Sequence, residues 1–156
     1  MRNDMGVNMK YLFCDCAEAN TGKTTFLLSV VDKLLSMGYC CKIETDLRNI
    51  NNPIKYAGNG ADRWVVLEKD NGKKIIVQTE GDYQVSFKNT SDYILKNNDV
   101  DVIICASRLD SAIKGKVLNF SGYKVHFFQH IISNDGKQFV KQQDFVGKFC
   151  EVIDSL

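Results

Sequence analysis

The chain has 156 residues, a formal net charge of +1, 44% hydrophobic residues and 25% charged residues. These values are typical of one globular domain with a core large enough to fold unaided, and the near-neutral charge argues against a dedicated surface for nucleic acid or membrane lipid. No apolar run reaches transmembrane length and no signal peptide opens the chain, so we expect a domain at 9–156 after a loose tail at 1–8.

The strongest secondary-structure pattern covers residues 9–44. An apolar stretch at 9–16 predicts a strand, and the small residues at 17–22 predict a short turn. Apolar residues then recur at helical spacing from Lys23 to Met37, and Gly38 provides a C-terminal stop. Residues 39–44 are typical of a second strand. Strand, helix and strand in this order predict a right-handed crossover and a parallel sheet.

An antiparallel hairpin is predicted next. Residues 49–62 are loop-like and contain the only proline. The stretches 63–68 and 73–79 are strand-like and are joined by Asp70-Asn71-Gly72. Because Asn-Gly is favoured in tight hairpins, we expect one antiparallel strand in an otherwise parallel sheet.

The rest of the chain continues the alternation of helices and strands. We expect a helix at 86–96, a buried strand at 100–105, a marginal helix at 109–118 and a last strand at 123–132. An apolar stripe then predicts a C-terminal helix that contains Phe145, Val146, Phe149, Val152 and Ile153. The predicted fold class is α/β, with three layers: a mostly parallel sheet, helices on both faces and one antiparallel hairpin strand.

The turn between the first strand and the first helix carries a phosphate-binding pattern. Ala17-Glu18-Ala19-Asn20-Thr21-Gly22-Lys23-Thr24 fits Gly-x-x-x-x-Gly-Lys-[Ser/Thr], except that Ala17 replaces the first glycine. Unpaired N–H groups and the helix dipole favour an anion at a helix start. Lys23 would reach the terminal phosphates and Thr24 would take a Mg²⁺ position. The expected nucleotide contacts are Asn20, Thr21, Gly22, Lys23, Thr24 and Thr25. The alternative is a turn in which Gly-Lys-Thr occurs by chance.

On these residues the chain resembles the P-loop NTPase superfamily, over roughly its first third. The resemblance implies ATP or another nucleoside triphosphate as ligand, with Mg²⁺. ATP is the default, because the guanine-reading Asn/Thr-Lys-x-Asp motif does not precede a helix in the sequence. Ala17 departs from the family pattern, since alanine adopts positive φ less freely than glycine, and this departure keeps a degenerate loop open.

A P-loop enzyme also needs an acid for its metal and a group that positions the attacking atom. The apolar run at 74–79 ends in Glu80-Gly81-Asp82, and strand ends of this kind face the ligand crevice of parallel sheets. Asp82, together with Thr24, is the expected metal pair, although Glu80 is an equal candidate and a solvated acidic loop is the alternative. Asp46, after the second strand, would orient a water or an acceptor hydroxyl, or would cap the following loop.

Other polar residues give weaker signals. Arg108 follows the strand at 100–105 and would stack on a base or neutralise phosphate charge, unless Ser107 simply caps the next helix. Asp15 lies inside the first strand and receives no role. His126 and His130 have helical i, i+4 spacing, but on a strand they would lie about 13 Å apart and share no metal.

The six cysteines are Cys14, Cys16, Cys40, Cys41, Cys105 and Cys150, and all but Cys150 fall in strands predicted to be buried. Free thiols in such positions favour a reducing, cytoplasmic setting. The alternative of a zinc site lacks the Cys-x-x-Cys spacing of such sites.

Three functions remain open. The first is an ATP hydrolase or nucleotide-gated switch that uses Lys23, Thr24 and an acid. The second is a small-molecule or nucleotide kinase in which Asp46 activates an acceptor hydroxyl. The third is a non-catalytic module with a degenerate loop that docks a protein partner through residues 49–79. The first is favoured, because kinases use several arginines in a lid and the arginines here are Arg2, Arg48, Arg63 and Arg108.

Overall fold

The computed structural model describes residues 9–17, 22–46, 63–79, 84–108, 112–118, 120–131 and 136–156. The elements, in chain order, are β1 (Tyr11–Cys16), α1 (Lys23–Ser36), β2 (Cys40–Asp46), β3 (Arg63–Glu68), β4 (Lys74–Gln78), α2 (Gln84–Lys96), β5 (Val102–Ser107), α3 (Ala112–Leu118), β6 (Lys124–Phe128) and α4 (Gln138–Ser155). Several predicted site residues lie outside the described ranges, namely Asn20, Thr21, Glu80 and Asp82.

The strands form one sheet in the order β2-β3-β4-β5-β1-β6. β1 pairs in parallel with β5 and with β6, and β4 pairs in parallel with β5. β3 is antiparallel to both of its neighbours, β2 and β4. Among the strands described, β3 alone therefore runs against the rest, which confirms the predicted mostly parallel sheet with one antiparallel hairpin strand.

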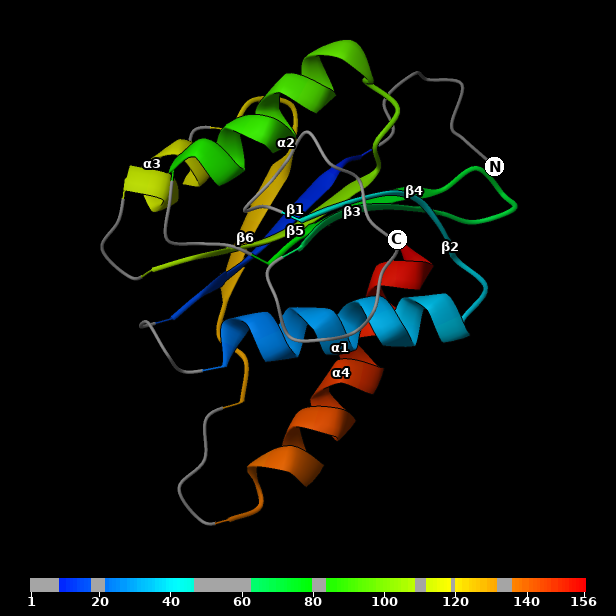
Figure 1. Ribbon diagram of the computed structural model, residues 1–156, viewed down its shortest axis with the longest axis vertical. Coiled ribbons are helices and arrows are strands. Elements are labelled where there is room, and N and C mark those ends of the chain that lie inside the picture. The colour runs from blue at the N-terminus through cyan, green and yellow to red at the C-terminus, as the bar shows by residue number, and fades with distance from the viewer. Residues whose placement is uncertain are drawn as a thin grey trace.

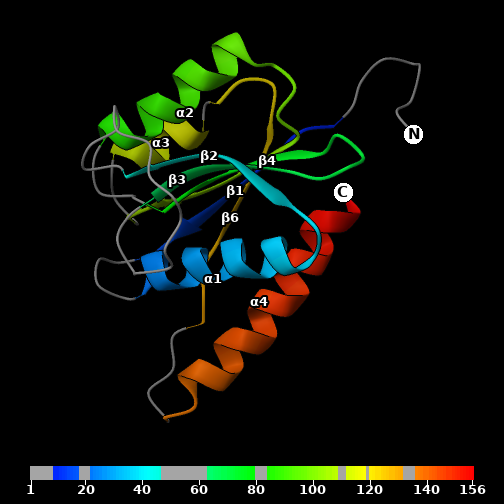
Figure 2. The same cartoon turned by 45° about the vertical axis from the view of Figure 1, so that its right-hand side comes forward.

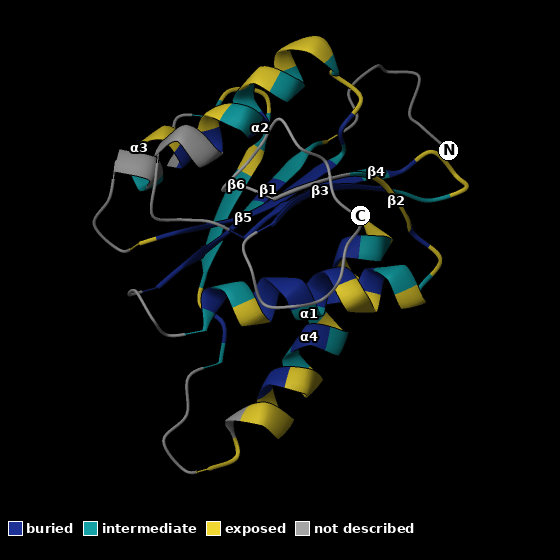
Figure 3. Cartoon of the chain, viewed as in Figure 1, coloured by how far each residue is buried: buried dark blue, intermediate teal, exposed yellow. Residues whose placement is uncertain are grey.

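Helices cover both faces of this sheet. Figure 1 shows α1 and α4 on one face and α2 and α3 on the other, and Figure 2 shows the same layers from a second direction. The inner strands β1, β3, β4 and β5 are largely buried, whereas the edge strands β2 and β6 are more exposed and α4 keeps an exposed outer side (Figure 3). The predicted three-layer α/β fold is thus confirmed.

Each face of the sheet has its own hydrophobic core, because alternate strand residues point to opposite faces. In β1, Leu12 and Cys14 belong to the core under α2 and α3, whereas Phe13 packs in the core under α1 and α4. The periodic apolar residues of α1 are fully buried in the second core, which confirms that helix; they include Phe26, Leu27, Val30, Val31 and Leu34. Full burial of each such side chain stabilises the fold by about 2 kcal/mol.

Several element boundaries differ from those predicted. β5 extends to Ser107 because it lies between β4 and β1 and is buried along its whole length. α3 is described from Ala112, and residues 109–111 of the predicted helix lie outside the described residues. β6 ends at Phe128 rather than at residue 132, because the chain leaves the sheet at His130, whose backbone N–H donates to the Asp15 carboxylate.

The prediction of buried cysteines is wrong at two positions. Cys14, Cys16, Cys105 and Cys150 are buried, but Cys40 and Cys41 are exposed. The physical reason is the strand order, since β2 is at the edge of the sheet and is not covered on its outer side by another strand. Cys150 is buried in α4, where its Sγ lies 3.8 Å from the Val30 carbonyl of α1.

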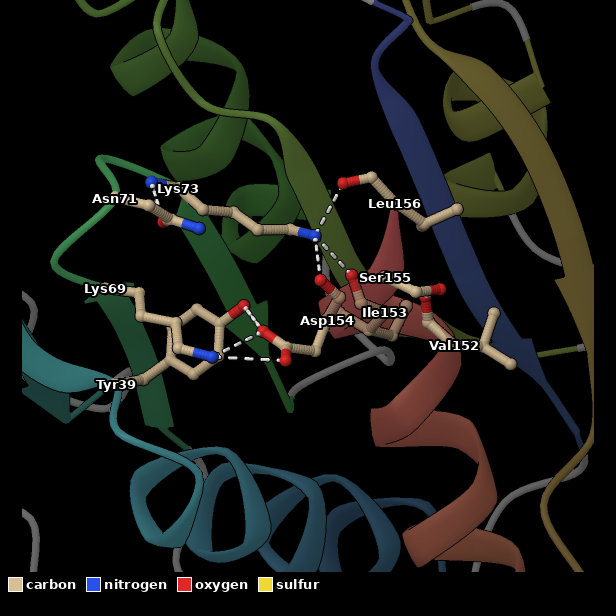
Figure 4. Close-up of polar contacts among 9 residues, drawn as sticks. All are labelled: Tyr39, Lys69, Asn71, Lys73, Val152, Ile153, Asp154, Ser155 and Leu156. Atoms are coloured by element: carbon tan, nitrogen blue, oxygen red, sulfur yellow. Dashed lines mark hydrogen bonds and ion pairs between the residues drawn. The ribbon is translucent and has the colours of Figure 1, made fainter. Parts of the chain in front are cut away.

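The C-terminal end of α4 is tied to the β3–β4 hairpin (Figure 4). The buried Lys73 Nζ donates to the carbonyl oxygens of Ile153 at 2.6 Å, Asp154 at 2.9 Å and Leu156 at 2.8 Å. The last carbonyls of a helix lack partners within the helix and carry partial negative charge, so a lysine is favourable there. The Asp154 carboxylate accepts from the Tyr39 hydroxyl at 2.6 Å and pairs with Lys69 at 3.0 Å. These contacts fix α4 against the sheet.

Candidate functional site

The phosphate-binding pattern lies at the carboxyl end of β1, in the interior of the sheet between β5 and β6. The Ala17 N–H donates to the Ser107 carbonyl at 3.2 Å and so continues the pairing of β1 with β5 by one residue. Ala17 is fully buried. At this position a small apolar side chain fits the end of a strand, which explains why alanine is accommodated in place of glycine.

Gly22 immediately precedes α1 and has φ of 99° and ψ of 21°. A residue with a Cβ is strained in this left-handed conformation, which explains why glycine is favoured at the second glycine position of the pattern. The Gly22 carbonyl accepts the first helical bond from Phe26 N at 2.9 Å. No side chain caps the start of α1, and its first turn contains no acidic residue. The first turn of α1 therefore offers backbone N–H groups and has no acidic side chain among its own residues.

Lys23 is the first residue of α1 and is 7% exposed. Its Nζ donates to the Ala17 carbonyl at 2.9 Å. The lysine thus turns back across the turn and joins its two ends. Of the neighbouring predicted residues, Thr24 is half-buried and Thr25 is exposed, both in the same first turn.

The predicted acids cannot be located beside this turn, because Glu80 and Asp82 lie outside the described residues. Only β5 separates β4 from β1, so the segment after β4 starts about 10 Å from β1, at the same edge of the sheet. The end of β4 is held by buried polar contacts that sequence reasoning missed. Thr90 Oγ1 donates to Gln78 Oε1 at 2.6 Å and accepts from Trp64 Nε1 at 3.0 Å.

Asp46 is not brought together with Lys23. β3, β4 and β5 lie between β2 and β1, which places the two strand ends about 19 Å apart. The crossover from α1 therefore carries the chain to the far edge of the sheet, rather than to the strand next to β1. The side chain of Asp46 is outside the described part of the structure.

Arg108 follows β5 directly and is exposed at the same edge of the sheet as the candidate turn. Its carbonyl accepts from the Ser107 hydroxyl at 3.1 Å and contacts Cys16 Sγ at 3.5 Å. The alternative, that Ser107 caps the following helix, stays a prediction, because residues 109–111 between Arg108 and α3 lie outside the described residues.

A buried carboxylate–imidazole pair lies beside Gly22, and sequence reasoning missed it. Asp15 Oδ2 is 2.8 Å from His130 Nδ1, and Asp15 Oδ1 accepts from His130 N at 3.2 Å. Both side chains are 0% exposed. A Cβ atom added to Gly22 would lie 3.6 Å from His130 Nε2. The only sequence signal was a charged residue, Asp15, within an apolar strand.

Two buried thiols are neighbours across β1 and β5, where Cys14 is in register with Cys105. A side-chain hydrogen bond between the two thiols lowers the pKa of Cys14 and raises that of Cys105, and burial raises the pKa of Cys105 further. All six cysteines are free. The described ranges contain no group of three or more His, Cys, Asp or Glu side chains that could hold a metal ion.

Comparisons with protein-family models, with curated proteins and with solved structures gave no match to this chain. Function is therefore inferred from the geometry of the site itself. Among the helices of the described residues, none has the length and apolar character needed to cross a membrane.

Proposed function

We propose that this chain binds a nucleoside triphosphate at the turn between β1 and α1, as P-loop proteins do, and that it acts as a Mg²⁺-dependent ATP hydrolase or nucleotide-gated switch. The observation that carries the proposal is the position of Lys23. Its buried amine lies 2.9 Å from the Ala17 carbonyl, directly after the left-handed Gly22. An ammonium at this point can exchange a carbonyl oxygen for a phosphate oxygen with a small movement.

The start of α1 supports the same ligand class. Its N–H groups carry partial positive charge, and the first turn adds a lysine and no acid. Burial of the Lys23 ammonium costs free energy, and charge-assisted hydrogen bonds to the oxygens of a polyphosphate would offset that cost. Arg108, exposed at the end of the adjacent β5, would add positive charge or stack on the base.

The metal would be held by Thr24 and by either Asp82 or Glu80. A Mg²⁺ ion held by these residues would supply positive charge that neutralises the negative charge developing on the phosphates. The position of β4, one strand beyond β5, supports this assignment, because β4 ends at the same edge of the sheet as β1 and the two acids follow β4 in the sequence.

Hydrolysis or switching is preferred over phosphate transfer to a small acceptor. The kinase hypothesis required Asp46 beside the transferring phosphate, and three strands separate the end of β2 from β1. The free thiols, including two exposed ones, support a reducing setting such as the cytoplasm.

The test is calorimetric titration of the folded protein with Mg²⁺-ATP, Mg²⁺-GTP and ADP, followed by assay of ADP release without an acceptor. The informative variant is Lys23→Met, which keeps the alkyl chain but removes the charge. Lys33→Met is the matched control, because Lys33 is exposed in the last turn of the same helix. We expect Lys23→Met to weaken ATP affinity tenfold or more, as loss of a charge-assisted contact predicts, and Lys33→Met to leave it within about twofold.

Equal ATP affinity in the wild type and in Lys23→Met would refute the proposal. If the wild type binds no nucleotide, the partner-binding module is the function that survives. ADP release that depends on an added acceptor would instead support the kinase.

A further inference from the structure

The buried pair formed by Asp15 and His130 has no role in the function proposed above. We propose that it is the positioning element of the phosphate turn: it holds the imidazole against Gly22 and thereby fixes the conformation in which α1 begins. The inference rests on the proposed function, because it assigns the residues that shape the same site.

In this pair, the Asp15 carboxylate contacts both the backbone and the ring of His130. Asp15 accepts from the backbone of His130 at 3.2 Å and from its ring Nδ1 at 2.8 Å, and both side chains are 0% exposed. A carboxylate only accepts hydrogen bonds, so Nδ1 carries the proton in this contact. Two bonds to one residue set both the position of its backbone and the rotation of its ring.

The ring that is fixed in this way lies beside the start of α1. It stacks on Phe26 of α1, with ring centroids 5.9 Å apart and planes inclined by 22°. His130 Nε2 lies 3.6 Å from the place that a Gly22 Cβ would occupy. The ring therefore contacts β1 through Asp15 and the first turn of α1 through Phe26, on either side of residues 17–22.

The segment after β6 is anchored at a second point, independently of Asp15. The Ile131 N–H donates to Gln142 Oε1 of α4 at 3.0 Å, and Gln142 is buried. His130 is thus held from β1 and its neighbour from α4. This arrangement provides a control, since loss of the Gln142 contact loosens the same segment without changing the contact between His130 and Asp15.

Electrostatics indicates how far the carboxylate opposes an anion in the turn. An unpaired buried carboxylate close to a polyphosphate would repel it. The Nδ1–H group donated to Asp15 screens part of that charge, so the pair opposes an anion less than an unpaired carboxylate would. Replacement of Asp15 by asparagine keeps the shape but removes the carboxylate, and its amide N–H can face Nδ1 and move the ring proton to Nε2.

The experiment compares Asp15→Asn with Gln142→Leu. Calorimetry measures the affinity for Mg²⁺-ATP and for inorganic tripolyphosphate, and NMR measures the ¹⁵N shifts of the His130 ring and the Gly22 and Lys23 amides. We expect Asp15→Asn to weaken both ligands by about tenfold and to shift the ring nitrogens and the Gly22 amide. Gln142→Leu is expected to leave both affinities within about twofold and the ring nitrogens unchanged.

Each outcome decides the matter. Unchanged affinities in Asp15→Asn, or equal losses in both variants, overturn the positioning role while the proposed function stands. If the wild type binds neither ligand, the proposed function fails, and the positioning role is then judged from the NMR shifts alone. A shift of the Gly22 amide in Asp15→Asn but not in Gln142→Leu supports the role, and any other pattern refutes it. If Asp15→Asn does not fold, tripolyphosphate titration of the wild type is used: His130 ring signals that move together with the Gly22 amide support the role, and static ring signals refute it.

Discussion

Replacement of Lys73 by methionine tests how strongly the β3–β4 hairpin holds the end of α4. Methionine keeps most of the apolar stem but removes the ammonium, which donates to three carbonyl oxygens at 2.6, 2.9 and 2.8 Å. A hydrogen bond to a charged group contributes about 1.5–3 kcal/mol when buried. Only the Ile153 contact is buried, and the other two are part-buried, so water can replace them in the variant.

Burial also opposes the charged lysine. Desolvation lowers the pKa of Lys73, so the variant recovers part of what it loses. The balance predicts a loss of about 2 kcal/mol in the free energy of unfolding. The assay is urea denaturation at neutral pH, with Lys69→Met as the control. Lys69 pairs with Asp154 at a part-exposed position, so its loss is expected to cost about 0.5 kcal/mol. Equal losses in the two variants would refute the claim that Lys73 caps the helix.

Three further predictions concern the turn, acid stability and the thiols. Gly22→Ala should lower the free energy of unfolding, measured by urea denaturation, by about 1–2 kcal/mol, because alanine is strained at the positive φ of this position. The new Cβ adds no clash, since its contact at 3.6 Å is an ordinary one. An unchanged stability would contradict this expectation. The Tyr39 hydroxyl, with Lys69, holds the pKa of Asp154 below its ordinary value, so Asp154 takes up its proton at a higher pH in the unfolded chain and the folded state loses stability as the pH drops below about 4. Unfolding curves between pH 2.5 and 6 should therefore show a shallower loss of stability in Asp154→Asn than in the wild type. An identical slope in the two proteins would rule this out. Iodoacetamide should label Cys40 and Cys41 in the folded protein and the other four cysteines only after unfolding, because those four are buried. Burial also raises the pKa of Cys150 to about 12, which keeps its thiol protonated and unreactive. Peptide mass spectrometry that finds Cys150 labelled as fast as Cys40 in the folded protein would disprove this prediction.

Local patterns were sufficient for most of the elements. The 3.6-residue spacing of apolar side chains predicts α1, and Asn71-Gly72 predicts the β3–β4 hairpin, because both signals act between residues close in sequence. These features needed no knowledge of which strands are neighbours.

What could not be predicted depends on contacts between distant parts of the chain. The edge position of β2 exposes Cys40 and Cys41 and separates Asp46 from the turn, and strand order is not written in any local pattern. Asp15 and His130 are 115 positions apart, so neither residue by itself indicates the pair. The capping of α4 by Lys73 spans about 80 residues in the same way.

The most direct test of the central claim is a crystal structure with Mg²⁺ and a non-hydrolysable ATP analogue. We expect the triphosphate to lie against the backbone N–H groups of Gly22, Lys23 and Thr24, with the Lys23 amine moved from the Ala17 carbonyl to a phosphate oxygen. A structure in which Lys23 still donates to Ala17 at saturating analogue, with the turn free of phosphate, would contradict it.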